Sequence, residues 1–262
     1  MNKLKIASGD FKYGLYWNAG VITEFLNLNV PIYLRVSGIS VLFPFFISKY
    51  NNNFFGKMIE FINNSKILNR YFFKDRIYDK LYNQAIALWK LNRKKQFEFE
   101  SHIELEKELM AYFGNIKIKD LGDNFEIESY DILKKEVYYF KPNDLYVDAL
   151  LASFSSPPFF KYYEYNNMYL IPTAEISLSP LKLDDIDLIT SLECSLKLPT
   201  PKNGAEILLF SFFLRKKKLF DIITKDKDVL APLKITFESL SGSSFNNARK
   251  FAKIWINKNM EV

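Results

Sequence analysis

Short apolar runs alternate with segments of helical periodicity along the first part of the chain, and this alternation limits the possible folds more than any other feature. Residues 4–7 and 31–36 are apolar runs typical of strands, and each is followed by a Ser-Gly turn. Residues 15–28 carry apolar side chains at helical spacing, and residues 41–47 form an apolar segment behind the second turn. Strand, turn and helix repeated in this order predict a mostly parallel sheet covered by helices.

The rest of the chain extends this pattern without an internal repeat or a clear linker. Further strands are predicted at residues 125–130, 136–140 and 207–213, and helices at residues 146–153 and 244–257 and across most of residues 51–113. The run at 207–213 is apolar apart from Ser211, which is typical of a strand buried on both faces. We therefore expect one domain over residues 1–262, with a three-layer α/β/α fold around a central, mostly parallel sheet.

The composition supports a large core and argues against nucleic-acid binding. Apolar residues make up 48% of the 262 residues, including 25 Phe and 16 Tyr, unlike the low hydrophobicity of disordered chains. The net charge is +6, but the densest basic runs, residues 93–95 and 215–218, are short and flanked by apolar or acidic residues. We interpret these runs as solvated turns or helix faces and expect no nucleic-acid partner.

Two residue types that occur once each restrict the chemistry. Cys194 excludes an intramolecular disulfide and fits a reducing compartment. The chain begins without an apolar stretch long enough for a signal peptide, so we expect a cytoplasmic protein. His102 precedes a predicted surface helix, and we expect it to be solvated. A Ser-His-Asp triad and a histidine-rich metal site are thereby disfavoured, and neither a metal nor a cofactor is expected.

Several segments carry a resemblance to a known family. Residues 9–14 look like a glycine-rich oxyanion loop, and residues 38–42 (Gly-Ile-Ser-Val-Leu) look like a G-x-S-x-G nucleophile elbow. Residues 152–160 keep an A-S-x-x-x-P-x-x-F pattern, and residues 167–174 stand in the place of G-x-x-Y-x-D-G-G. In this order the segments resemble bacterial patatin-like lipid acyl hydrolases over most of the chain.

The resemblance implies a nucleophile but leaves it without its base. In that family the elbow serine is activated by an aspartate, and backbone N–H groups of the glycine loop hold the oxyanion. Ser40 stands in the nucleophile's place, whereas Pro172 stands where the aspartate belongs and cannot accept a proton. Glu175 is the nearby acid that would have to substitute. Losing the base typically costs about three to six orders of magnitude in rate.

Both loops around the nucleophile also depart from the family pattern. Gly38 keeps the first elbow glycine, whereas Leu42 replaces the second, which disfavours the tight turn. Gly9 is retained in the oxyanion loop, but Asp10 and Phe11 replace glycines. The carboxylate of Asp10 would repel a developing oxyanion.

The sequence is compatible with three functions. The first is a patatin-like protein, catalytically impaired or inactive, that binds a lipid or a protein partner. The second is an active serine esterase or phospholipase that uses Ser40 with a non-standard base. The third is an interaction protein whose basic, aromatic surface makes peripheral contact with the inner face of a membrane. A carboxylate within hydrogen-bond reach of Ser40 would distinguish the active esterase from the other two functions. We expect Ser40 at a strand-to-helix turn, with Pro172 facing it across a cleft. The oligomeric state is left open.

Overall fold

The computed structural model describes residues 3–10, 14–73, 102–156, 160–195, 200, 204–232 and 242–260, and within them an eight-stranded sheet. The strand order is β5-β6-β3-β2-β1-β7-β8, and β4 pairs with β3. The strands are β1 (Leu4–Ser8), β2 (Ile32–Val36), β3 (Phe125–Asp131), β4 (Glu136–Tyr139), β5 (Tyr163–Tyr165), β6 (Met168–Pro172), β7 (Leu188–Thr190) and β8 (Asp228–Leu230). The pairs β1–β2, β1–β7, β2–β3 and β7–β8 are parallel, whereas β4, β5 and β6 pair antiparallel. The predicted, mostly parallel sheet is confirmed.

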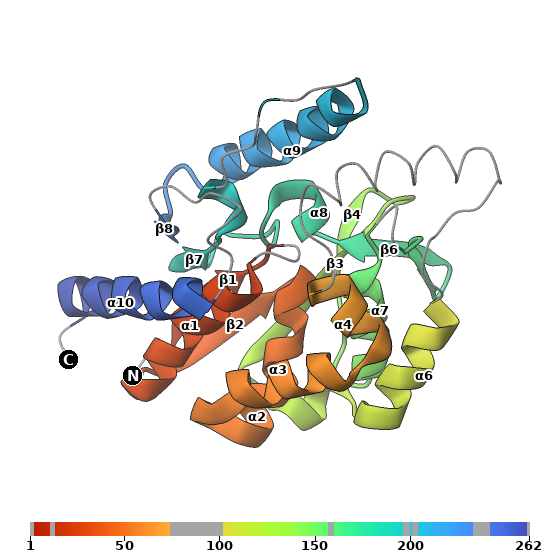
Figure 1. The fold of residues 1–262 in the computed structure, drawn as a ribbon, viewed down its shortest axis with the longest axis horizontal. Helices are drawn as coiled ribbons and strands as arrows, with labels where there is room; N and C mark the ends of the chain where they lie inside the picture. Colours follow the sequence, from red (N-terminus) through yellow and green to blue (C-terminus); the bar gives the residue numbers. More distant parts are fainter. Residues whose placement is uncertain are drawn as a thin grey trace.

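Helices cover both faces of this sheet (Figure 1). One face lies against α1 (Leu15–Asn27), α2 (Phe43–Tyr50), α3 (Phe54–Asn64), α4 (Lys66–Phe73), α6 (His102–Phe113), α7 (Tyr146–Phe154) and α10 (Gly242–Asn259), and the other lies under α8 (Ala174–Ser177) and α9 (Gly204–Ile223). Short 3₁₀ helices are η1 (Gly38–Leu42), η2 (Asn51–Asn53), η3 (Ile118–Leu121) and η4 (Glu193–Ser195). The architecture is the three-layer α/β/α fold that the alternation of strands and helices predicts.

The larger core lies between the sheet and the α1 side. Ile6, Leu34 and Ile127 point to this face from β1, β2 and β3 and have no exposed surface. Fully burying a side chain of this size stabilises the fold by roughly 1.5–3 kcal/mol. Gly20 lets α1 approach α10 closely, because a Cβ atom there would lie 2.4 Å from the carbonyl oxygen of Phe245. The parallel strands therefore pack closely against the helices of this side.

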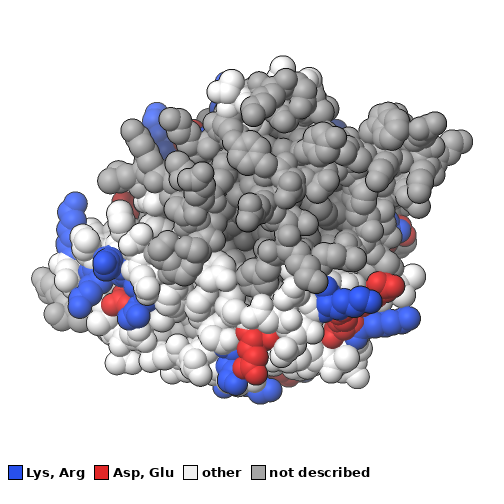
Figure 2. Space-filling model, in the orientation of Figure 1, with Lys and Arg blue, Asp and Glu red and all other residues white. Residues whose placement is uncertain are grey.

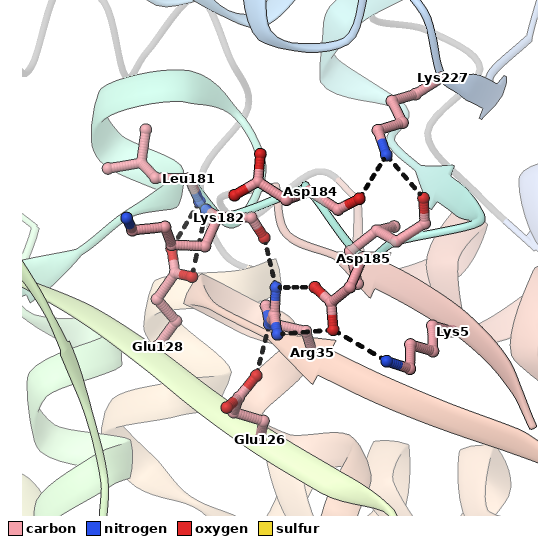
Figure 3. Close-up of polar contacts among 10 residues, drawn as sticks. Lys5, Arg35, Glu126, Glu128, Leu181, Lys182, Asp184, Asp185 and Lys227 are labelled. Carbon is pink, nitrogen blue, oxygen red and sulfur yellow. Dashed lines mark hydrogen bonds and ion pairs between the residues drawn. The ribbon is translucent and has the colours of Figure 1, made fainter.

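The opposite face carries a cluster of charges (Figure 3). A smaller apolar core, which includes Ala7 and Ile189, lies on the same face. Arg35 on β2 donates to Glu126 at 2.5 Å, to Asp185 at 2.9 Å and to the carbonyl oxygen of Lys182 at 2.6 Å. Lys5 Nζ lies 3.0 Å from the other oxygen of Asp185. We call Lys5, Arg35, Glu126 and Asp185 the Arg35 cluster.

The same face holds the connection between β6 and β7 against the sheet. Glu128 on β3 accepts the backbone N–H of Leu181 at 2.5 Å. Lys227 donates to the carbonyl oxygens of Asp184 and Ile186 at 3.2 and 3.1 Å (Figure 3). Burial raises the pKa of the Glu128 carboxyl above its ordinary value. Charged side chains and hydrogen bonds to the backbone thus hold the connection between β6 and β7, which has little regular secondary structure of its own.

The strand predicted at residues 207–213 is wrong, because this run belongs to α9. The helix buries Phe210 and Phe220, while Ile207 and Leu214 point outward with 57% of their surface exposed. A continuous apolar run carries no period, so a strand and a largely apolar helix cannot be told apart from the pattern alone.

Candidate functional site

Ser40 lies in the turn between β2 and α2, where the sequence predicts it. It stands in the middle of η1, and α2 follows directly with Pro44 in its first turn. Gly38 has φ +57°, and a Cβ atom there would lie 2.3 Å from the carbonyl oxygen of Asp10. Glycine is therefore required where the elbow segment crosses the first loop.

The hydroxyl of Ser40 is fully buried and bonded within the fold. Its Oγ donates to the carbonyl oxygen of Gly9 at 3.0 Å and lies 2.7 Å from Ser8 Oγ, and Asn18 Nδ2 lies at 3.4 Å. A hydroxyl has a single proton to donate, and a backbone carbonyl cannot remove it. No carboxylate or imidazole of the described residues bonds to Ser40, so the expected position at a cleft is replaced by a buried one.

Asp10 occupies the start of the first loop with its carboxylate turned toward the end of β7. Its oxygens accept Ser191 Oγ at 2.5 Å and the backbone N–H of Leu192 at 2.6 Å, and the side chain has no exposed surface. The backbone N–H of Asp10 donates to the carbonyl oxygen of Leu178 at 3.1 Å. This N–H is therefore committed within the fold rather than open to an oxyanion. Phe11, the next predicted loop residue, lies outside the described residues.

Asn18 on α1 joins these groups into one network. Its Nδ2 donates to the carbonyl oxygen of Gly9 at 3.1 Å and to the Asp10 carboxylate at 3.2 Å, and its Oδ1 accepts Thr190 Oγ1 at 2.9 Å. We call the buried side chains Ser8, Asp10, Asn18, Ser40, Thr190 and Ser191 the Ser40 cluster. They meet at the carboxyl ends of β1 and β7, where parallel sheets often bind ligands. Ser8, Asn18, Thr190 and Ser191 were not predicted. Ser8 and Thr190 end strands and Ser191 follows one, and small polar residues at the carboxyl end of a strand are the signal that could have found these three. Asn18 lies on α1 and carries no such signal.

Pro172 ends β6, and the residues that follow it contact the turn that carries Ser40. The backbone N–H of Ala174 donates to Ser37 Oγ at 3.3 Å. A Cβ atom on Gly38 would lie 3.0 Å from Cβ of Ala174. The segment predicted to supply the dyad base is thus beside the elbow, but Pro172 is buried and brings no titratable group to it. Leu42, at the end of η1, is also fully buried and belongs to the larger core.

Glu175, the predicted substitute base, is bonded elsewhere. It accepts the hydroxyl of Ser156 and forms an ion pair with Lys216 of α9. Both interactions tie α8 to its neighbours, and none links Glu175 to Ser40. Serine hydroxyls donate to carboxylates at three described pairs, Ser65–Glu108, Ser156–Glu175 and Ser191–Asp10, and Ser40 belongs to none of them.

His102 is buried, so the prediction of a solvated histidine is wrong. Its Nε2 lies 2.9 Å from Ser155 Oγ, and its ring centre lies 5.2 Å from that of Phe160. Ser155 donates its own proton to the carbonyl oxygen of Leu151 at 2.7 Å, so the imidazole acts as the donor in this pair. The predicted helix is present as α6, and its first residue, His102, faces the core.

Cys194 is buried and lies beside the Ser40 cluster. Its Sγ lies 3.6 Å from the carbonyl oxygen of Ser191. Burial, with a contribution from the charge of Asp10, raises the pKa of the Cys194 thiol to about 11. The thiol is therefore neutral at physiological pH and poorly suited to act as a nucleophile.

Two described grooves lie away from these residues. One of about 470 Å³ is lined by Tyr50, Lys57, Phe61, Glu108 and Tyr112 among others. The second, of about 350 Å³, opens at the amino end of β2. On the face seen in Figure 2, described basic side chains lie next to acidic ones rather than forming one continuous basic surface. The described residues contain no group of three or more potential metal ligands.

Comparison with known proteins leaves the resemblance to patatin-like hydrolases without independent support. The chain matches no protein-family model and no curated protein. Among the described helices, none is both long and apolar enough to cross a bilayer.

Proposed function

We propose that this protein is a patatin-like fold that has lost serine hydrolase chemistry and acts by binding a lipid or a protein partner. The observation that carries the proposal is the hydrogen bonding of Ser40, whose proton is directed to the carbonyl oxygen of Gly9. A neutral serine hydroxyl is a weak nucleophile, and general-base assistance contributes about 10²–10⁴-fold in rate. Among the described residues, the groups bonded to this hydroxyl supply no such assistance.

The remaining parts of the expected machinery support the same conclusion. Pro172 replaces the base beside the elbow, and Glu175 is occupied by Ser156 and Lys216. The Asp10 N–H, which the resemblance would place among the oxyanion donors, is bonded to Leu178. Nucleophile, base and oxyanion site act as a unit in this chemistry. Restoring one of them should therefore recover little activity while the others are missing.

The experiment that tests the proposal is labelling with a fluorophosphonate probe, followed by mapping of any adduct by mass spectrometry. The wild type is compared with Ser40→Ala and with Ser156→Ala, the latter because Ser156 donates to a carboxylate. We expect equal, background labelling of all three proteins. An adduct on Ser40 would revive the active esterase. An adduct on Ser156 that is lost in Ser156→Ala would also overturn the proposal and move the chemistry to Ser156 and Glu175.

A further inference from the structure

The helix α9 has one face anchored to the body of the protein. Phe210 and Phe220 are buried, and Lys216 pairs with Glu175 of α8. These contacts are spread over about three turns, so the orientation of the helix about its own axis is fixed. The residues on its outer face are therefore held outward by packing.

That outer face carries large aliphatic side chains interleaved with cations. Ile207, Leu214 and Ile222 are exposed over 57%, 57% and 62% of their surface. Arg215 and Lys218 are also exposed. Positions 207, 214, 218 and 222 follow one another at intervals of seven, four and four, which places them on one side of an α-helix. We call Ile207, Leu214, Arg215, Lys218 and Ile222 the α9 stripe.

We infer that the α9 stripe is a docking surface for an anionic lipid bilayer. Exposed aliphatic residues on a helix lying on the surface can enter the region between headgroups and acyl chains, while neighbouring cations bind anionic headgroups. Asp221 is the one exposed acid among the described side chains of α9, so the charge of this face is predominantly positive. The net charge of +6 for the whole chain favours approach to the same kind of surface.

Charge also argues against a second copy of this chain as the occupant. A two-fold interface is formed by the same patch on both subunits. Pairing two α9 stripes in this way would bring Arg215 and Lys218 of one copy toward those of the other, and like charges opposed across an interface weaken it. An anionic lipid bilayer offers an apolar interior to the aliphatic side chains and negative headgroups to the cationic ones.

The inference deepens the binding role proposed above but does not depend on the inactivity of Ser40. A hydrolase could dock through α9 equally well. Vesicle binding and probe labelling are separate measurements, so either proposal can fail while the other holds.

The test is cosedimentation of the full chain with lipid vesicles. Vesicles of phosphatidylcholine alone are compared with vesicles containing about 30% phosphatidylglycerol. We expect at least roughly tenfold stronger binding to the anionic vesicles, and weaker binding when the salt concentration rises from about 0.1 M to about 1 M. Arg215→Gln with Lys218→Gln should weaken binding about thirtyfold, and Leu214→Ser with Ile222→Ser roughly tenfold to a hundredfold.

Matched controls use exposed residues on other helices. Ile103→Ser with Ile254→Ser removes aliphatic side chains of 64% and 66% exposure from α6 and α10. Lys250→Gln with Lys253→Gln removes two exposed cations from α10. Both controls should bind like the wild type, and all variants should keep the wild-type melting temperature within a few degrees. Absence of binding to anionic vesicles, or equal loss in controls and α9 variants, would overturn the inference. So would a dimer of the wild type that the α9 substitutions dissociate.

Discussion

The Ser40 cluster and the Arg35 cluster lie on opposite faces of the same strands and bury charge in different ways. Ala7 and Ser8 are neighbours on β1, yet Ala7 pairs beside Arg35 on one face, whereas Ser8 bonds to Ser40 on the other. In the Ser40 cluster a fully buried carboxylate accepts hydrogen bonds from two side chains and one backbone N–H. In the Arg35 cluster a buried guanidinium meets carboxylates that keep 27% and 45% of their side-chain surface in solvent.

This difference supports the proposal that the residues resembling an active site form a structural core. A buried carboxylate that accepts several hydrogen bonds leaves several donors unsatisfied when it is removed. Partners that reach solvent can be hydrated instead, which lowers the cost of losing an ion pair. The two clusters should therefore respond unequally to substitution.

The largest effect is expected from Asp10→Ala. The change removes the acceptor of Ser191 Oγ and of the Leu192 N–H, and one acceptor of Asn18 Nδ2, in a region closed to solvent. We expect the free energy of unfolding to fall by about 3–5 kcal/mol, measured by urea denaturation. Asp226→Ala, at an exposed position, serves as the control and should change it by less than about 0.5 kcal/mol. Equal small losses in both variants would show that Asp10 is not structural.

The second effect concerns alkaline pH and Cys194. The thiol pKa rises from 9.0 to about 11 in the folded protein, so between these values the unfolded chain releases its proton while the folded one retains it. Stability should therefore fall as pH rises through this window, by about 2–3 kcal/mol from this group. Urea denaturation at pH 8 and pH 11 should show a smaller alkaline loss for Cys194→Ala than for the wild type. Identical losses would mean that the thiol is not held neutral by its surroundings.

A smaller effect is expected from Arg35→Met. The substitution keeps the aliphatic volume but removes the partner of Glu126 and Asp185, which solvent can partly hydrate. We expect a loss of about 1–2 kcal/mol in the free energy of unfolding. Lys5→Met, which removes only the exposed outer pair with Asp185, should cost less than about 0.5 kcal/mol. A loss at Arg35 as large as that of Asp10→Ala would remove the distinction between the clusters.

The smallest effect is expected from Ser40→Ala. It removes the bonds to Ser8 and to the carbonyl oxygen of Gly9 without leaving a charge unsatisfied. The expected loss is about 1 kcal/mol, and Ser8→Ala should give a similar value because the two hydroxyls share one hydrogen bond. If Ser40→Ala were instead to stabilise the protein, Ser40 would be a strained residue of the kind found in working active sites.

The sequence predicts the layers of this fold better than it predicts the contacts of the site. Alternating apolar runs locate β1, β2 and the turn at Ser40, because strand and helix periods are local properties. The run at 207–213 has no period, so its pattern does not distinguish the helix α9 from a strand. Ser191 could not be placed near Asp10 from the sequence, since it is brought there by the pairing of β1 with the distant strand β7. Likewise, the burial of His102 depends on which side of α6 meets Phe160.

The central claim is that Ser40 is a structural hydroxyl, and comparing ester turnover by the wild type and Ser40→Ala tests it most directly. Short-chain and phospholipid esters are offered to both proteins under identical conditions, after confirming that both are folded. The account predicts equal rates, indistinguishable from buffer, because the Ser40 proton is held by Gly9 and no described base can take it. Turnover by the wild type that disappears in Ser40→Ala would contradict it.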